Sequence, residues 1–188
     1  MPKHAKPYDA HMLAIGTIVT GWTHIEVTYH GFILLLIPDG KVAQRVYELL
    51  GNESRAALIR DELPAKLHND EQRDALQHFL KAAAICKENR NAVAHAEYIA
   101  GEKPDTLIAY RGRSRDLVRH RFHELPLDAL HAIQSEIQTT AMYGVELYLA
   151  LTLAAIPASG LPAKPPLPRK WDLRSPPMPG AGQTEPAS

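Results

Sequence analysis

Long segments with apolar residues at helical spacing limit this 188-residue chain to a mainly helical fold. The first such segment extends from about Asp9 to Ile37, and the turn formers Pro38, Asp39 and Gly40 end it. Its apolar residues recur every three or four positions: Ile15, Ile18, Val19, Trp22, Ile25, Tyr29, Ile33 and Leu36. This spacing places them on one side of a helix, where they face a core.

Four further elements are expected along the chain. Two shorter helices are predicted at Val42 to Leu50 and at Glu53 to Leu63. A second long helix is predicted to begin after Asn69 and Asp70 and to continue to about Tyr98, and a last long helix to extend from Pro126 to about Ile156. Between the long helices the period changes, and "DTLIAY" and "DLVRHRF" on either side of "RGRS" predict a β-hairpin. The expected fold is therefore all-α in the main, a bundle of two long helix pairs with short helices and one hairpin.

A change in composition divides the chain into two parts. The whole chain is 45% hydrophobic, enough to bury one core, which is expected in residues 1–156, and nine of the fifteen prolines fall between Pro157 and Pro186. Residues 157–188 are therefore expected to form an extended or disordered tail. Its basic residues and Trp171 allow a docking segment, but a solvated tail is the simpler interpretation.

Charge and cysteine content exclude several classes of protein. Lys and Arg number 21, as do Asp and Glu, so any site for a polyanion must be local. Cys86 is alone, which excludes an internal disulfide and a cysteine cluster for zinc. The stretch "MPKHAKPYDA" lacks the apolar core of a signal peptide, so a cytoplasmic protein is expected. The apolar stretch Ile137 to Ile156 contains Glu146 and suits a buried core helix better than a membrane span.

The stretch "KENRNAVAHAEY" carries polar residues that a plain structural helix does not need. At about 100° per residue, Arg90 falls within the apolar stripe of its helix, while Asn91 and His95 lie together at one edge. Glu26 falls in the middle of the stripe of the first helix. Because a charge on a core-facing stripe is costly unless paired, Glu26 and Arg90 are expected to meet between the two long helices. Such a pair has a purely structural alternative, a salt bridge that fixes helix register.

The same residues carry a resemblance to a known family. "ENRNAVAHAEY", in which His95 follows Arg90 by five positions with Asn91 between them, resembles the R-X(4-6)-H signature of HEPN-domain proteins. "GWTHIE" on the first helix is similar to a Trp and Glu pattern in their helical relatives. The resemblance implies a metal-independent endoribonuclease without cofactor, with catalytic Arg90, Asn91 and His95 and supporting Glu26. It also implies a homodimer whose two motifs face each other, and a toxin or defence setting with a cognate antitoxin.

The chemistry of RNA cleavage agrees with these residue types. Cleavage without a metal needs a proton acceptor for the ribose 2′-hydroxyl, a proton donor for the leaving 5′-oxygen, and positive charge beside the phosphorane. Histidine suits both proton transfers, and arginine offers phosphate a fixed fork of donors. Asn91 is expected to orient the phosphate or the imidazole. The competing interpretation is a non-catalytic helical module that binds RNA or a partner protein.

A local basic run follows the motif. The five residues Arg111, Arg113, Arg115, Arg119 and Arg121 are opposed only by Asp116 within that run, and they are expected to bind the phosphate backbone of RNA. Charged residues that protect an edge strand from aggregation are the equal alternative.

Overall fold

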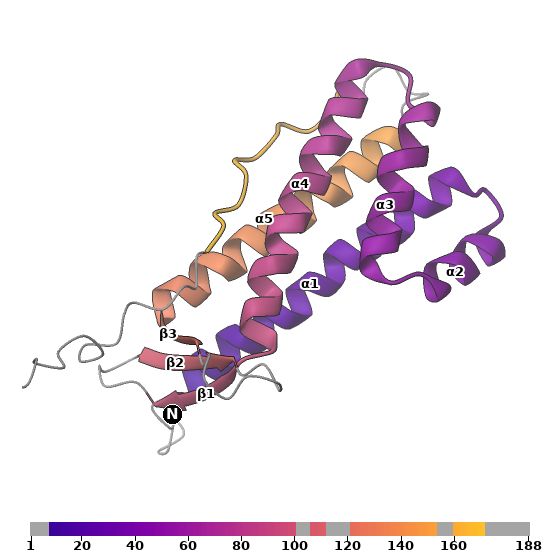
Figure 1. Cartoon of the computed structure of the whole chain (residues 1–188). Helices are drawn as coiled ribbons and strands as arrows, with labels where there is room; N and C mark the ends of the chain where they lie inside the picture. Colours follow the sequence, from indigo (N-terminus) through magenta and orange to yellow (C-terminus); the bar gives the residue numbers. More distant parts are fainter. Residues whose placement is uncertain (1–7, 101–105, 112–120, 154–159, 172–188) are drawn as a thin grey trace, which may run out of the picture.

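The chain folds into a helical bundle with a small sheet at one end (Figure 1). The structure, a computed structural model, describes residues 8–100, 106–111, 121–153 and 160–171. The elements are α1 (Asp9–Leu36), α2 (Gly40–Leu49), α3 (Asn52–Glu62), the 3-10 helix η1 (Leu63–Lys66), α4 (Asp70–Ala94), β1 (Glu97–Ala100), β2 (Thr106–Arg111), β3 (Arg121–Pro126) and α5 (Leu127–Thr152). The predicted all-α class is confirmed. No helix within the described residues has the length and apolar content to cross a membrane.

Helices α1 and α5 pack side by side and run in the same direction. Close approaches at glycine define their register, because a Cβ added at Gly21 would lie 3.3 Å from Ile137 and one at Gly31 would lie 3.1 Å from the Tyr148 ring. In both pairs the residue number on α5 exceeds that on α1 by nearly the same amount, as it does when two helices run parallel. Glycine at these two sites allows the backbones to approach closely.

Helix α4 crosses the α1 and α5 pair in the opposite direction. Phe79 makes edge-to-face contacts with Tyr29 and Phe32 of α1, with ring centroids 6.0 and 5.4 Å apart. Along α5, the Tyr143 hydroxyl donates to the Ala75 carbonyl, while the Cys86 thiol, near the other end of α4, donates to Thr140. The apolar stripes of the three long helices thus meet in one core, as their periodicity predicts.

Side-chain caps explain where two of the helices begin. The Asp39 carboxylate accepts from the backbone N–H groups of Lys41 and Val42 at the start of α2, and the Asn69 amide oxygen accepts from Gln72 at the start of α4. Asn52 does not cap α3, because Gly51 is the N-cap residue and the Asn52 side chain is engaged elsewhere.

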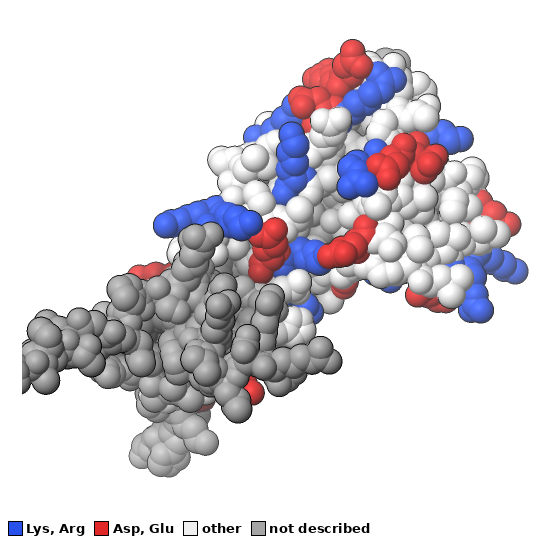
Figure 2. Space-filling view, viewed as in Figure 1, with Lys and Arg blue, Asp and Glu red and all other residues white. Residues whose placement is uncertain are grey.

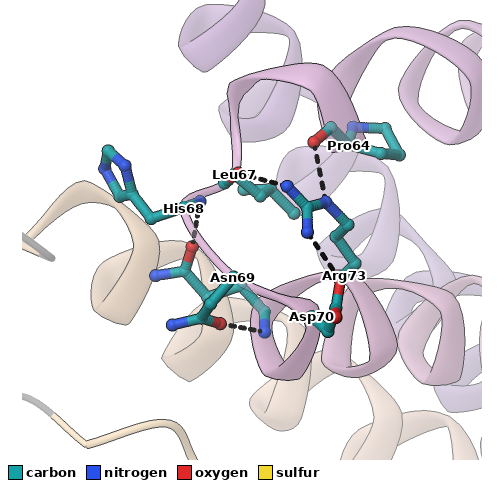
Figure 3. A network of polar contacts seen from close by, with 7 residues as sticks. Pro64, Leu67, His68, Asn69, Asp70 and Arg73 are labelled. Carbon is teal, nitrogen blue, oxygen red and sulfur yellow. Dashed lines mark hydrogen bonds and ion pairs between the residues drawn. The ribbon is translucent and has the colours of Figure 1, made fainter.

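An arginine closes the turn between η1 and α4 (Figure 3). Arg73 donates from Nε to the Pro64 carbonyl at 3.3 Å and from Nη2 to the Leu67 carbonyl at 2.9 Å, and its Nη1 pairs with Asp70 at 2.7 Å. Pro64 lies within η1 and Leu67 is its C-cap residue, and the apolar period does not predict this turn. The guanidinium therefore gives a second donor to the Pro64 carbonyl, which already accepts from the Leu67 N–H, and binds the Leu67 carbonyl where the chain leaves η1.

The sheet corrects two expectations. It has three antiparallel strands in the order β1, β2, β3, whereas the sequence predicts a single hairpin. Residues expected to extend the second long helix to Tyr98 instead form β1, since α4 ends at Ala94. The described part of the second hairpin strand is β3, while residues 112–120, which include most of "RGRS" and the expected start of that strand at Asp116, lie outside the described residues. The last helix begins at Leu127 with Pro126 as its N-cap residue and ends at Thr152.

Residues 160–171 form an extended strap that lies along α4 and α5 (Figure 1). The expectation of a solvated tail is therefore wrong for this segment. Glu136 of α5 accepts from the Arg169 N–H at 3.1 Å and from the Trp171 indole at 3.3 Å. Asn89 of α4 donates to the Arg169 carbonyl at 2.9 Å and accepts from the Trp171 N–H at 3.2 Å. Two side chains thus satisfy the backbone of a segment that forms no secondary structure of its own.

Candidate functional site

The last turn of α4 carries the three motif residues. Arg90 and Asn91 are half-buried within the helix, and His95 is the exposed C-cap residue. The Tyr98 hydroxyl donates back to the Val93 carbonyl and fixes the chain where it leaves the helix. Burial raises the pKa of Tyr98 to about 12, so this hydroxyl stays a donor at neutral pH. His95 therefore projects from an anchored helix end.

Arg90 is tied to Asn91 rather than to an acid. Its Nη1 donates to the Asn91 side-chain oxygen at 3.0 Å, and within the described residues it forms no ion pair. Its Nε is buried and has no hydrogen-bond partner in the part of the chain that the structure describes. An orphaned guanidinium N–H inside a protein is costly, which makes Arg90 a donor without a matching acceptor.

The expected contact between Glu26 and Arg90 is wrong as a direct pair. Because Tyr29 of α1 lies beside Phe79 of the oppositely directed α4, Glu26 is level with a residue near position 82. Arg90 lies about eight residues, or roughly 12 Å, further along α4. Helical phase predicted that both side chains point inward, but phase carries no information on their level along the bundle.

Glu26 instead takes part in a polar cluster with α2 and α3. Its carboxylate accepts from the Asn52 amide at 2.7 Å, and Asn52 in turn accepts from Arg55 Nη1 at 2.9 Å. Arg55 lies 3.7 Å above the Tyr47 ring and donates to the Tyr47 carbonyl at 3.0 Å. This cluster joins three helices and satisfies each of its members, so Glu26 has a structural role in this state and does not support Arg90 directly.

The motif residues are neighbours without forming one closed constellation. The Arg90 and Asn91 side chains are in contact, whereas His95 meets Asn91 through its backbone N–H, which donates to the Asn91 carbonyl at 3.3 Å. An anion in front of the helix end would meet an amide, an exposed imidazole and an arginine whose fork is only partly used. These are groups that bind phosphate and transfer protons.

Sequence reasoning missed the part of the strap that lies beside this helix end. Glu88, Asn91 and His95 are spaced three and four residues apart, so they share one side of α4. Lys170 of the strap pairs with Glu88 at 2.7 Å. The strap thus adds a cation to the side of α4 that carries Asn91 and His95. The sequence carried a signal for it, because the basic residues and Trp171 of the tail allowed a docking segment.

The predicted substrate arginines are only partly visible. Arg111 and Arg121 are backbone partners on β2 and β3, which places them at the same end of that strand pair. Arg113, Arg115 and Arg119 lie outside the described residues. Figure 2 shows basic and acidic residues interleaved over the described residues on the side of the molecule in view. The visible surface in this view therefore carries no broad field of one sign.

The described residues include no group of three or more His, Cys, Asp or Glu side chains placed to hold a metal ion. Comparison with known protein families, with curated proteins and with solved structures finds no match to this chain.

Proposed function

We propose that the protein is a metal-independent endoribonuclease of HEPN type that acts at the C-terminal end of α4. One observation carries the proposal: His95 is exposed at an anchored helix end, one turn from an arginine that Asn91 holds and that no acid neutralises within the described residues. In a purely structural salt bridge, an acidic side chain would instead neutralise the arginine.

The roles follow from the chemistry of each group. His95 accepts the proton of the ribose 2′-hydroxyl, whose oxygen then attacks phosphorus, and the imidazolium formed in this way gives that proton to the departing 5′-oxygen. Arg90 stabilises the negative charge of the phosphorane, and Asn91 holds the guanidinium through their hydrogen bond. The bond between phosphorus and the 5′-oxygen breaks, which leaves a 2′,3′-cyclic phosphate and a 5′-hydroxyl.

The proposed biological setting comes from the same resemblance. For an enzyme of this type, the proposed location is the cytoplasm and the proposed substrate is RNA. Its proposed partners are a second copy of the chain and a cognate antitoxin in a toxin or defence system. The substrate arginines Arg111 to Arg121 remain part of the proposal.

A non-catalytic module that binds RNA or a partner protein is the second candidate. The enclosed Nε of Arg90 favours it, because a phosphate reaches this atom only if the side chain turns outward. In that function the motif serves as a polar seam at the end of α4 and cuts nothing.

Cleavage of an end-labelled RNA pool, with and without EDTA, tests the proposal. We expect His95→Ala to lower the rate by roughly 100-fold or more, which is the usual contribution of a general acid or base, and Arg90→Ala to lower it as well. His131→Ala is the matched control, because His131 is also exposed but lies on α5. Circular dichroism verifies that each variant is folded.

Two outcomes contradict the enzyme. An unchanged rate in folded His95→Ala removes the histidine from the reaction. Wild-type protein that binds RNA without cutting any member of the pool favours the binding module.

A further inference from the structure

Among the elements that the structure describes, none covers one side of the pair formed by α1 and α5. Thr140 and Tyr143 of α5 contact α4. Met142 follows Thr140 by two positions and Val145 follows Tyr143 by two, so each lies about 200° around the helix from a residue that contacts α4. Met142 is 57% exposed on this outer side, Leu149 is 48% exposed, and Val27 of α1 is 63% exposed. We call the exposed residues Val27, Gln138, Met142, Val145, Glu146 and Leu149 the outer face.

The outer face contains a groove of about 370 Å³ between the two helices. Most of its exposed lining is apolar, with Val27, Ala141, Met142 and Val145 contributing, and His24, Gln138 and Glu146 are its polar members. Single exposed apolar residues are common on proteins, but an apolar groove with polar members is typical of a surface that meets a partner.

The spacing on both helices fits a helical partner. On α5 the exposed residues Gln138, Met142, Val145, Leu149 and Thr152 are separated alternately by four and three positions. On α1 the exposed residues Leu13, Gly16, Thr20, Thr23 and Val27 are separated by three and four. This 3.5-residue repeat produces a seam along which another helix packs, and the small residues on α1 allow a close approach.

We infer that the outer face binds a second copy of the chain, with the two α5 helices antiparallel and crossing at Met142. In that arrangement Gln138, four residues before the crossing point, meets Glu146 of the second copy, four residues after it. The amide then donates to the carboxylate at both ends of a two-fold symmetric contact. A parallel arrangement would instead place the two Glu146 carboxylates side by side. The surface is therefore complementary to itself in one orientation.

This dimer has a geometric consequence for the candidate site. Because α4 lies on the opposite side of the α1 and α5 pair, the two copies of Arg90 and His95 face away from the contact. The dimer does not rest on the proposed function, and it differs from the motif-to-motif arrangement that the family resemblance implies. Each helix end stays open to a substrate.

Sedimentation velocity of the full chain over a range of concentrations tests the inference. We expect a dimer for the wild type, and for Met142→Glu a dissociation constant about 30-fold higher or more, which is the effect of losing a central interface residue. Leu49→Glu is the matched control, because Leu49 is 73% exposed on α2, away from the outer face. Leu149→Glu replaces Met142→Glu if circular dichroism shows the latter to be unfolded.

The orientation is tested separately by cross-linking. Under mild oxidation we expect Met142→Cys to form a disulfide-linked dimer and Leu49→Cys to remain monomeric on a non-reducing gel, because the native Cys86 is buried. Three results would each overturn the inference. The first is a wild type that is monomeric at every concentration, and the second is a folded Met142→Glu variant that dimerises like the wild type. The third is a dimeric Met142→Cys variant that does not cross-link. Since His95→Ala leaves the outer face intact, loss of cleavage and loss of the dimer are distinguishable.

Discussion

Gly144 is the position where the packing of the three long helices is most sensitive to added volume. A Cβ at this residue would overlap the Phe79 ring and would lie 2.9 Å from the Thr28 methyl carbon. The ring has little room to move, because Tyr29 and Phe32 contact it on α1. Overpacking of a filled core costs about 1–3 kcal/mol, while alanine gains about 1 kcal/mol over glycine in helix propensity. Because the added Cβ would overlap the ring, the upper part of the overpacking range, about 2–3 kcal/mol, applies, and we expect Gly144→Ala to lower the free energy of unfolding by about 1–2 kcal/mol.

Urea denaturation followed by circular dichroism measures this change, and a melting temperature lower by about 2–8 °C accompanies it for a chain of this length. Gly16→Ala is the matched control, because Gly16 also lies within a helix but has no atom within 4 Å of an added Cβ. We expect that variant to gain about 0.5–1 kcal/mol. If Gly144→Ala were stabilised as much as Gly16→Ala, the close approach of α5 to Phe79 would be refuted.

Two further predictions concern the strap and the buried thiol. Glu136→Ala removes the acceptor of the Arg169 and Trp171 N–H groups, so we expect trypsin to cut after Arg169 and Lys170 roughly 5- to 30-fold faster, while Glu146→Ala, on the outer face, should leave the rate unchanged. Burial raises the pKa of the Cys86 thiol from 9.0 to about 11. The protonated thiol is the form that the fold favours, so its contribution to stability is complete below pH 9 and is lost as the pH rises to 11. Urea denaturation across this range should show a steeper loss for the wild type than for Cys86→Ala, and parallel curves would contradict the assignment.

The helices were predictable because their apolar residues report a local period. The caps at Asp39 and Asn69 are equally local, since each depends only on residues up to three positions away, although the sequence was used there only to place a turn and a helix start. β1 was missed because "EYIA" is too short to establish a period of two, and Tyr98 also fits the helical spacing that precedes it. The strap was missed for a related reason. An extended proline-rich segment has no period, and its position depends on Asn89 and Glu136, which come from different helices.

In the candidate site, too, features set by local helical phase were predictable, and features set by contacts between helices were not. That Arg90 lies toward the core and that His95 is accessible follow from helical phase and from the end of α4. The partner of Glu26 depends on the level of α1 against α3, which sequence periodicity does not contain, and Asn52 takes the place expected for Arg90. The hydrogen bond between Arg90 and Asn91 was not predicted, because adjacent residues point about 100° apart around a helix.

The parallel arrangement of α1 and α5 has a consequence for the speed of folding. Thr28 and Gly144 meet although they are more than a hundred positions apart, so the central helix pair forms only after a long loop has closed. Bundles of sequential antiparallel helices need no such closure. We therefore expect this chain to fold more slowly than helical proteins dominated by local contacts. Until α5 arrives, the apolar stripe of α1 that includes Ile18, Trp22 and Ile25 lacks its main cover, and the partly folded chain is prone to aggregate.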